Sequence, residues 1–412
     1  MASRRESLMA LAAAPLLALA GPARAAQPPA AGSGPDGPAP SPRDNFHFAG
    51  TYVNSAYMHP LPLDSAAAMR AYLAGRVDPS LRRKPAHDAR ALFAKLINAT
   101  PDEIAEVPST SYGESFVVGA LGIQGDRRAK VVTDILHFDG SLYTYGELAR
   151  QGSGLTVLPM TPQGRIDMNR LEAAVDRDTR LVAVSLVSQV NGFEHDLKTV
   201  CEIAHRKGAA VYVDAVQGAG AVPVDVRACG VDFLACSTFK WLMGDFGYGF
   251  LYVRRDLLPK LKRTQFGYHQ PKTFAYHAFP GDPPGPALFE SSPNNATAAG
   301  FFEVGSLSEA SEVAVGVSLN NILGMGVETL QRNRQPLIER LREKISARYR
   351  PMTPPDSRSG IISFVAPTAA KLRPRLQEAQ VNIQLYPNRF RVSPSVFNTM
   401  ADVDRVCDVV LA

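Results

Sequence analysis

Residues 210–217 of this chain read Ala-Val-Tyr-Val-Asp-Ala-Val-Gln, and residues 233–241 read Phe-Leu-Ala-Cys-Ser-Thr-Phe-Lys-Trp. A glycine-rich segment and a third apolar run, Phe-Leu-Tyr-Val, follow at residues 244–253. Short apolar runs that end in polar residues or glycine are typical of buried strands in a doubly wound α/β sheet. Asp214 ends the first run and Lys240 follows the second, so both are expected at the carboxyl ends of strands, where such sheets bind ligands.

An acid and a lysine in these positions are the groups that a pyridoxal 5'-phosphate site requires. The lysine amine binds the cofactor aldehyde as an imine, and a carboxylate beside the pyridine nitrogen keeps that nitrogen protonated, so that the ring accepts electrons from the substrate. Burying the Lys240 charge in an apolar run is unfavourable, and forming an imine removes the charge. An aspartate after a strand also serves as a turn former. We nevertheless predict Lys240 and Asp214 as catalytic residues.

The stretch as a whole resembles the class V aminotransferases of fold type I, a family that includes cysteine desulfurases, kynureninases and isopenicillin N epimerase-like proteins. The resemblance implies an α/β fold. A large domain would contain a mostly parallel seven-stranded sheet between helices, and a smaller C-terminal domain would be α+β. We place the large domain, with an N-terminal arm, at residues 45–300 and the small domain at residues 301–412.

Hydroxyl residues stand at the start of a predicted helix near residue 110, where free backbone N–H groups form a seat for an anion. By resemblance to the family, Thr110 and Ser111 hold the cofactor phosphate together with Ser237; simple N-capping of the helix is the alternative. Ser306 closes a Phe-Glu-Val-Gly-Ser segment that is similar to the family segment reaching the phosphate of the neighbouring subunit's cofactor. The resemblance therefore implies a homodimer with shared active sites.

Three more side chains are expected around the cofactor ring. Register with the family points to Phe138 as the residue that stacks on the ring, with the adjacent His137 as the alternative. Gln217 matches the family residue that approaches the phenolic oxygen of the ring. Gln189 stands where the family usually has asparagine, so its longer side chain departs from the family pattern.

Residues 389–399, Arg-Phe-Arg-Val-Ser-Pro-Ser-Val-Phe-Asn-Thr, are similar to the family segment whose arginine holds the substrate carboxylate. Arg391 fits that position, because a guanidinium binds a carboxylate through two parallel hydrogen bonds; a surface arginine is the alternative. Asn54 belongs to a short segment that resembles the family's entry strand near the carboxylate, although a plain edge strand has the same pattern. The irregular section at residues 265–299 is long enough to predict a functional loop or an interface.

Residues 1–25 are typical of a targeting segment. Arg4 and Arg5 precede an alanine- and leucine-rich run, and Ala-Arg-Ala at residues 23–25 supplies a small-x-small cleavage pattern. The arginine pair resembles a twin-arginine signal, with an ordinary secretory signal as the alternative. We therefore expect a periplasmic or secreted protein, with a flexible Pro/Gly linker at residues 26–44 and no membrane association of the mature form.

The composition is that of a globular enzyme, with 412 residues, 45% hydrophobic and 20% charged. A formal net charge of +5 without a dense run of lysine and arginine argues against a nucleic-acid partner. The four cysteines form no close Cys-x-x-Cys pair, so we expect no metal site, and their apolar surroundings argue against a required disulfide.

The expected reaction begins with removal of the α proton of an amino acid or an amino-acid-containing substrate. Epimerisation, elimination and transamination diverge after this step. A desulfurase needs an accessible, activated loop cysteine, and none stands between Ala379 and Arg391. Phe239 also replaces the histidine that usually precedes the family's lysine. We therefore expect an epimerase or a lyase, with an aminotransferase as one alternative and a non-catalytic binding or regulatory protein as another.

Overall fold

The computed structural model describes residues 42–412, apart from residue 79 and residues 82–84. The predicted signal segment and residues 26–41 of the predicted linker lie outside the described residues. The end of that linker differs from the prediction, because Pro42–Asn45 form a 3-10 helix, η1. Its Arg43 guanidinium lies 2.7 Å from the carboxylate of Asp402 near the C-terminus. Residues 42–44, which the prediction assigned to the linker, therefore belong to a regular element that contacts the C-terminal helix region.

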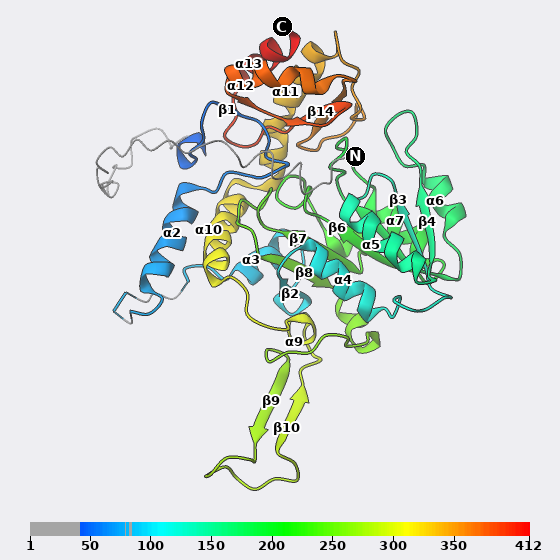
Figure 1. The fold of residues 1–412 in the computed structure, drawn as a ribbon, viewed down its shortest axis with the longest axis vertical. Coiled ribbons are helices and arrows are strands. Elements are labelled where there is room, and N and C mark those ends of the chain that lie inside the picture. Colours follow the sequence, from blue (N-terminus) through cyan, green and yellow to red (C-terminus); the bar gives the residue numbers. More distant parts are fainter. Residues whose placement is uncertain (1–41, 79, 82–84) are drawn as a thin grey trace. The chain divides into compact units, whose positions relative to one another are not determined.

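The large domain is built on a seven-stranded sheet with the order β2-β8-β7-β6-β5-β3-β4 (Figure 1). Its strands are β2 (Ile104–Val107), β3 (Lys130–Asp134), β4 (Gly154–Leu158), β5 (Thr179–Ser185), β6 (Ala210–Asp214), β7 (Phe233–Ser237) and β8 (Gly249–Val253). Within this sheet only β8 runs antiparallel to its neighbours. The predicted mostly parallel, seven-stranded sheet is confirmed.

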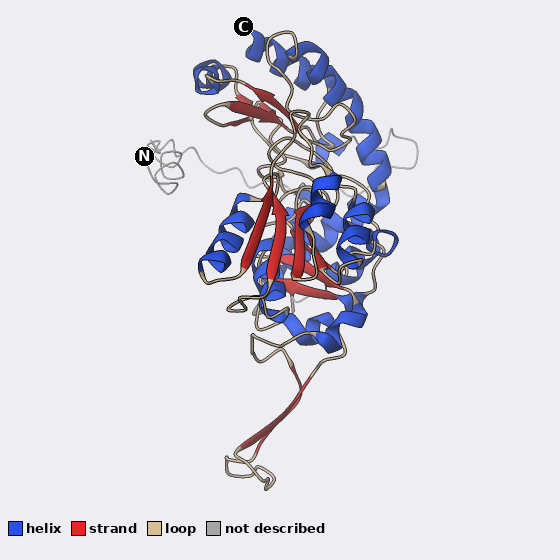
Figure 2. Ribbon diagram, turned by 90° about the vertical axis from the view of Figure 1, so that its right-hand side faces the viewer, coloured by secondary structure: helices blue, strands red, loops and turns tan. Residues whose placement is uncertain are grey.

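Helices cover both faces of the sheet (Figure 2). Because side chains alternate along a strand, Val211 and Val213 pack into one core layer and Tyr212 packs into the other. The first layer includes α3 (Ala89–Leu96), α6 (Met168–Ala174), α7 (Leu197–His205), α8 (Val226–Cys229) and α10 (Glu309–Met325), and the second includes α4 (Thr110–Ala120) and α5 (Asp139–Arg150). Burial on both faces explains the near-continuous apolar runs of the strands.

Polar side chains end the central parallel strands at one edge of the sheet. Ser185 ends β5, Asp214 ends β6 and Ser237 ends β7. Ser185 and Asp214 are direct partners across the paired strands. The sheet therefore gathers at one edge groups that lie far apart in the sequence, as in other open α/β sheets.

The small domain is α+β, as the sequence predicted. Its sheet has the order β11 (Ile362–Val365), β14 (Arg389–Val392), β13 (Gln384–Leu385), and its helices are α11 (Val327–Ile345), α12 (Arg373–Glu378) and α13 (Met400–Leu411). Strand β1 (Thr51–Tyr52) of the N-terminal arm pairs with β12 (Val381–Asn382), so the arm lies with the small domain. The core of this domain takes in residues from Leu337 onward. The boundary at residues 300 and 301 stays a prediction.

Residues 265–299 are not the irregular section that the sequence suggested. They contain an antiparallel hairpin of β9 (Pro271–Tyr276) and β10 (Phe289–Pro293), and α9 (Ala298–Phe302) begins at their end. The hairpin extends away from the seven-stranded sheet in both views (Figures 1 and 2). Both of its faces are largely exposed, so the sequence lacks the apolar alternation by which a half-buried strand is recognised.

The remaining elements connect these layers. They are α2 (Leu63–Gly75) and the 3-10 helices η2 (Pro101–Glu103), η3 (Arg255–Lys260) and η4 (Ala369–Leu372). No single helix in the described part of the chain combines the length and the apolar composition needed to cross a membrane. Helices α10 and α11 meet those criteria only as a joined pair, which is bent by 77°.

Candidate active site

Lys240 lies in the turn after β7, with only 8% of its surface exposed. Its Nζ stands 5.6 Å from the centre of the Phe239 ring, and no described residue accepts a hydrogen bond from it. Burial lowers the pKa of this amine to about 8, although the negative charge of Asp214 opposes the shift; the positive charge of Arg391 adds to it. At neutral pH a larger fraction of Lys240 is thus uncharged and nucleophilic than of an exposed lysine.

Asp214 ends β6 near the centre of the sheet and is 2% exposed. Its Oδ1 accepts a hydrogen bond of 2.9 Å from the Val216 N–H. Burial raises the pKa of this carboxyl, while the positive charges of His137 and Lys240 lower it. The fold therefore brings the two predicted catalytic residues to one edge of the sheet, within range of each other's charge.

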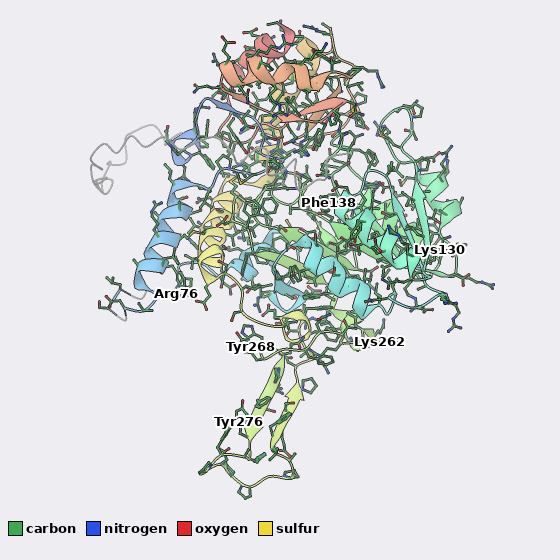
Figure 3. All side chains as sticks on the ribbon, viewed as in Figure 1. Arg76, Lys130, Phe138, Lys262, Tyr268 and Tyr276 are labelled. Atoms are coloured by element: carbon green, nitrogen blue, oxygen red, sulfur yellow. The ribbon has the colours of Figure 1, made fainter. Side chains whose placement is uncertain are left out.

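His137, and not Phe138, lies beside Asp214. The His137 ring is 1% exposed, and its Nδ1 lies 2.8 Å from Oγ of Ser185, the direct cross-strand partner of Asp214. The Phe138 ring covers the start of α5, where a Cβ on Gly140 would stand 2.5 Å from it (Figure 3). This arrangement favours the alternative, His137, over Phe138, and the contact of either ring with a cofactor stays a prediction. Strand β3 ends at Asp134 and a turn follows, so the alternating directions of side chains along the strand do not extend to residues 137 and 138.

Three residues of the predicted anion seat lie together at the start of α4, and their contact with a phosphate stays a prediction. Thr110 and Ser237 are buried and bonded to each other: the Thr110 N–H lies 2.8 Å from Ser237 Oγ, and the Ser237 N–H lies 2.9 Å from Thr110 Oγ1. Ser111 is exposed at the second position of the helix, and Ser109 caps the helix by accepting from the Tyr112 N–H. The structure thus places three of the predicted phosphate ligands around the positive end of one helix dipole.

Gln217 is buried and held at both ends of its amide. Its Nε2 donates to the Ala56 carbonyl at 2.8 Å, and its Oε1 accepts from the Trp241 indole N–H at 2.9 Å. One N–H of Nε2 is left over for a ligand, so the predicted contact with a phenolic oxygen fits this arrangement. The Trp241 indole thereby fixes the orientation of this amide.

Gln189 lies close to the site through its backbone more than through its side chain. Its carbonyl accepts a hydrogen bond of 2.9 Å from Nη1 of Arg391. Its side-chain Nε2 lies 3.4 Å from Oδ1 of Asp139, at the start of α5. The contact of the Gln189 side chain with the cofactor ring stays a prediction.

Arg391 is a buried cation, 2% exposed, on strand β14 of the small domain. No carboxylate among the described residues lies within ion-pair distance of it, and its Nε has no hydrogen-bond partner in the described part of the chain. Burial lowers the pKa of this guanidinium. Asn54 stands beside the same strand, since it pairs with Ser393, and its Oδ1 also lacks a partner among the described residues. Buried polar groups of this kind call for a ligand.

Ser306 lies apart from this cluster within the chain. It is exposed, and its hydroxyl contacts the Tyr268 hydroxyl at the base of the β9–β10 hairpin (Figure 3). It lines a cavity of about 720 Å³ whose other walls include Arg90, Glu303 and Glu312. None of the other predicted site residues lines that cavity. The contact of Ser306 with a neighbouring subunit's cofactor stays a prediction.

Glu114 is a buried residue near the site that the sequence analysis did not identify. It is 3% exposed on α4, one turn after Thr110, and its carboxylate accepts from the hydroxyls of Ser141 and Tyr145. Its other contact is His137, whose Nε2 lies 3.3 Å away. Only its spacing of four residues from Thr110, which puts both on one helix face, pointed to it in the sequence.

These residues fit the groups of pyridoxal 5'-phosphate one by one. Lys240 would hold the aldehyde, Asp214 the pyridine nitrogen, and the start of α4 with Ser237 the phosphate. The buried guanidinium of Arg391, whose Nε has no partner among the described residues, leaves a further anionic position on the small-domain side. When bound, the cofactor supplies an acceptor for the electron pair released at the substrate α carbon.

The family model for aminotransferase class V matches residues 82–385 of this chain. A probable cysteine desulfurase of Methanothermobacter thermautotrophicus is 31% identical over 309 residues, which cover 72% of this chain and 72% of that protein. An uncharacterized aminotransferase, YcbU, of Bacillus subtilis is 38% identical over 174 residues, 42% of this chain and 46% of that protein.

Two solved structures share the fold at low sequence identity. The cysteine desulfurase CsdA of Escherichia coli superposes with a TM-score of 0.76 at 20% identity, covering 89% of this chain and 96% of CsdA. The cystine C–S lyase C-DES, in complex with its product cysteine persulfide, superposes with a TM-score of 0.75 at 19% identity, covering 87% and 97%. The extent of the family match and of the first relative settles the assignment: this chain belongs to the aminotransferase class V family of fold type I and is a pyridoxal 5'-phosphate-dependent enzyme.

Proposed function

We propose that this enzyme is a lyase that acts on an amino acid, removing the α proton and then expelling a substituent from the β carbon. The observation that carries the proposal is the pair of buried cations on one site, Lys240 and Arg391, with Asp214 as the nearby carboxylate. A substrate carboxylate would compensate the charge of Arg391, because a guanidinium binds a carboxylate through two parallel hydrogen bonds. The α carbon would then be presented to Lys240.

The roles follow from these positions. Lys240 would serve as the base for the α proton, and its pKa of about 8 suits a base at neutral pH. Asp214 would keep the pyridine nitrogen of a bound cofactor protonated, and His137 would lie against its ring. Arg391 and Asn54 orient the substrate, which turns the reaction into an effectively unimolecular step.

The thiols argue against a mechanism in which a cysteine of this chain takes up sulfur. Burial raises the pKa of all four thiols, Cys201, Cys229, Cys236 and Cys407, the last to about 11. A sulfur-accepting cysteine must instead be accessible and have a lowered pKa. We therefore propose a lyase in which no cysteine of this chain takes up sulfur; C-DES, which shares the fold, is named a cystine C–S lyase.

The test uses the cofactor-loaded enzyme in deuterated water with L-amino acids that carry a sulfur, oxygen or halide substituent on the β carbon. Elimination consumes one water and yields an α-keto acid, ammonia and the released substituent with its proton. We expect α-deuterium exchange into the remaining substrate, and keto acid and released substituent in equal amounts, all unchanged when the four cysteines are replaced by alanine. Racemisation without release would establish an epimerase, and amine transfer to an added keto acid an aminotransferase. Absence of exchange across the panel would favour a binding protein.

We further propose that the enzyme acts as a homodimer with shared sites. Ser306 is exposed and separate from the cluster around Lys240, which fits a residue that serves a partner's site. The β9–β10 hairpin carries exposed aromatic side chains, among them Phe274, Tyr276 and Phe289. A two-stranded hairpin has little stability of its own in water, so a surface that covers these rings would stabilise it.

A further inference from the structure

Glu114 is a buried carboxylate whose only potential cationic partner among the described residues is a histidine. Its Oε1 accepts from the Tyr145 hydroxyl at 2.6 Å, its Oε2 from the Ser141 hydroxyl at 2.5 Å, and His137 Nε2 lies 3.3 Å from Oε1. No lysine or arginine of the described residues comes within 4.0 Å of it. A buried carboxylate needs a positive partner, and here only His137 can supply the charge.

Both nitrogens of the His137 ring face groups that can accept a proton. Nε2 faces the Glu114 carboxylate, and Nδ1 lies 2.8 Å from Oγ of Ser185, a hydroxyl that can accept as well as donate. Two donors on one ring are the pattern of the charged imidazolium. Burial disfavours that charge, but the hydrogen bond and charge of Glu114, followed by the charges of Asp214 and Asp134, raise the pKa of His137 above its usual value.

The same histidine acts on the carboxylate that the cofactor nitrogen requires. Burial raises the pKa of Asp214, and the His137 charge is the largest of the influences that lower it again, ahead of the Val216 N–H and Lys240. The charges therefore alternate along the line Glu114, His137, Asp214. Tyr145 also faces His137 from α5, and its pKa is raised by burial, so its hydroxyl stays neutral.

We propose that Glu114 is a positioning residue for the cofactor site: through His137 it keeps Asp214 ionised, and so keeps the pyridine nitrogen protonated. The proposal rests on the assignment of Asp214 to that nitrogen. Removing the charge of Glu114 would leave His137 neutral, which in turn favours a protonated Asp214. A protonated Asp214 no longer stabilises the charged ring nitrogen, so the cofactor becomes a weaker electron acceptor.

The first measurement is the charge of His137 in Glu114→Gln, an almost isosteric change that leaves groups able to bond Tyr145 and Ser141. Histidine-selective isotope labelling and NMR report the ring's protonation with and without cofactor, and His137→Asn assigns its signal among the eight histidines. We expect His137 to be charged at pH 7.5 in the wild type and neutral in Glu114→Gln. An unchanged charge in the variant would overturn the proposal.

The second measurement is the rate of α-proton exchange by the cofactor-loaded enzyme. Glu114→Gln should lower kcat about tenfold or more, since one unit of pKa is a factor of ten, and leave KM within about twofold. Glu114→Asp should restore part of the rate. Tyr145→Phe, the matched control, removes a hydroxyl from the same carboxylate but keeps its charge, and should leave His137 charged and kcat close to the wild type.

Two outcomes separate this proposal from the site assignment on which it rests. If Asp214→Asn itself leaves exchange unchanged, the assignment of Asp214 fails, whatever Glu114 does. If Asp214→Asn abolishes exchange but Glu114→Gln, with a neutral His137, exchanges at the wild-type rate, the assignment stands and the role of Glu114 is refuted. Equal losses of rate in Glu114→Gln and Tyr145→Phe would indicate a structural role and also refute it.

Discussion

At the scale of single residues, the site holds charges that water would normally surround. Lys240 and Arg391 are both buried cations. Asp214 is the carboxylate whose charge acts on Lys240, but among the described residues no carboxylate lies within 4.0 Å of Arg391. Folding around unpaired charge is unfavourable, so residues of this kind lower stability in exchange for affinity toward ligands. Their substitution should therefore change stability and function in opposite directions.

The pKa of Lys240 predicts how cofactor capture depends on pH. The amine must be neutral to attack an aldehyde, and its pKa is lowered to about 8 by burial. Capture of pyridoxal 5'-phosphate by cofactor-free protein should therefore accelerate as the pH rises from 6 and level off above about 8, about two units below an exposed lysine. Stopped-flow visible absorbance measures the rate. A midpoint near 10 would contradict the lowered pKa, and Lys240→Ala should show no capture.

The lowered pKa of Lys240 also predicts how the stability of the cofactor-free protein changes with pH. Between pH 8 and 10.5 the unfolded state binds more protons at this lysine than the folded state, so this contribution makes the cofactor-free protein more stable as the pH rises through that window. Below pH 8 the full penalty of the buried amine is present. Chemical unfolding of the wild type and of Lys240→Met at pH 7 and pH 10 tests this prediction. The excess in the free energy of unfolding of the variant over the wild type should be smaller at pH 10.

Arg391→Met should stabilise the cofactor-free protein while it weakens substrate binding. Methionine fills a similar volume without a buried charge, so the free energy of unfolding should rise by on the order of 1–3 kcal/mol. Loss of the charge-assisted hydrogen bonds should raise KM for an amino acid by about tenfold or more. Thermal unfolding and steady-state kinetics measure the two effects. Arg405→Met, at a largely exposed arginine of α13, is the control, and a destabilised Arg391→Met with normal KM would contradict the carboxylate role.

At the scale of elements, α4 combines two tasks on one face. Its first turn carries Thr110, whose N–H donates to Ser237 Oγ at the predicted anion seat, and its next turn carries Glu114 to His137. Gly113 permits this placement, because a Cβ there would stand 3.0 Å from the Ala235 side chain of β7. The close approach of helix to sheet therefore positions both the anion seat and the buried carboxylate.

The β9–β10 hairpin carries the exposed aromatic side chains that we propose to be covered by a second subunit. Replacing Phe274 and Phe289 with serine should weaken dimerisation at least tenfold, since each buried aromatic side chain contributes about 1.5–3 kcal/mol. Sedimentation velocity measures the monomer–dimer equilibrium. The unfolding midpoint of the monomer should stay unchanged, because neither ring belongs to the described hydrophobic cores. Tyr143→Ser, an exposed aromatic on α5, is the matched control; an unaltered equilibrium in the hairpin variant would exclude the hairpin from the interface.

At the scale of the whole molecule, the candidate site is assembled from both domains. The large domain supplies Lys240, Asp214 and the start of α4, and the small domain supplies Arg391, which hydrogen-bonds to the Gln189 carbonyl of the large domain. The N-terminal arm adds Asn54, whose Nδ2 lies 3.0 Å from Oδ1 of Asn382 in the small domain. A movement of the small domain would therefore carry the residues proposed to hold the substrate carboxylate relative to Lys240.

The export of the whole chain stays a proposal that rests on the arginine pair. If the twin-arginine reading is right, Arg4→Lys combined with Arg5→Lys should retain folded, cofactor-loaded precursor in the cytoplasm, because that pathway recognises the arginines themselves. Cell fractionation with absorbance of the bound cofactor measures it. An ordinary secretory signal needs only positive charge, so periplasmic accumulation of the double variant would support that alternative.

The sequence by itself determined the family and the cofactor through its resemblance to class V aminotransferases. Local information, namely apolar runs of strand length and the residue types that end them, indicated the parallel sheet and placed Asp214 and Lys240 at the ends of its strands; the catalytic roles of this pair stay a prediction. The small-domain arginine, Arg391, was predicted from the resemblance of Arg-Val-Ser and Phe-Asn-Thr, within residues 391–399, to the family pattern.

Only the tertiary structure decided which side chains meet. The turn after β3 presents His137 instead of Phe138 to Asp214, and α4 brings Glu114 to that histidine from 23 residues away in sequence. The hairpin at residues 271–293 was not predicted from the sequence, because neither face of its strands is buried and the apolar alternation of a half-buried strand is missing. The pattern of apolar residues shows which face of an element is buried. Which side chains of two elements meet depends on the turns and on the rotation of each helix, and these are set by long-range packing and not by a local pattern.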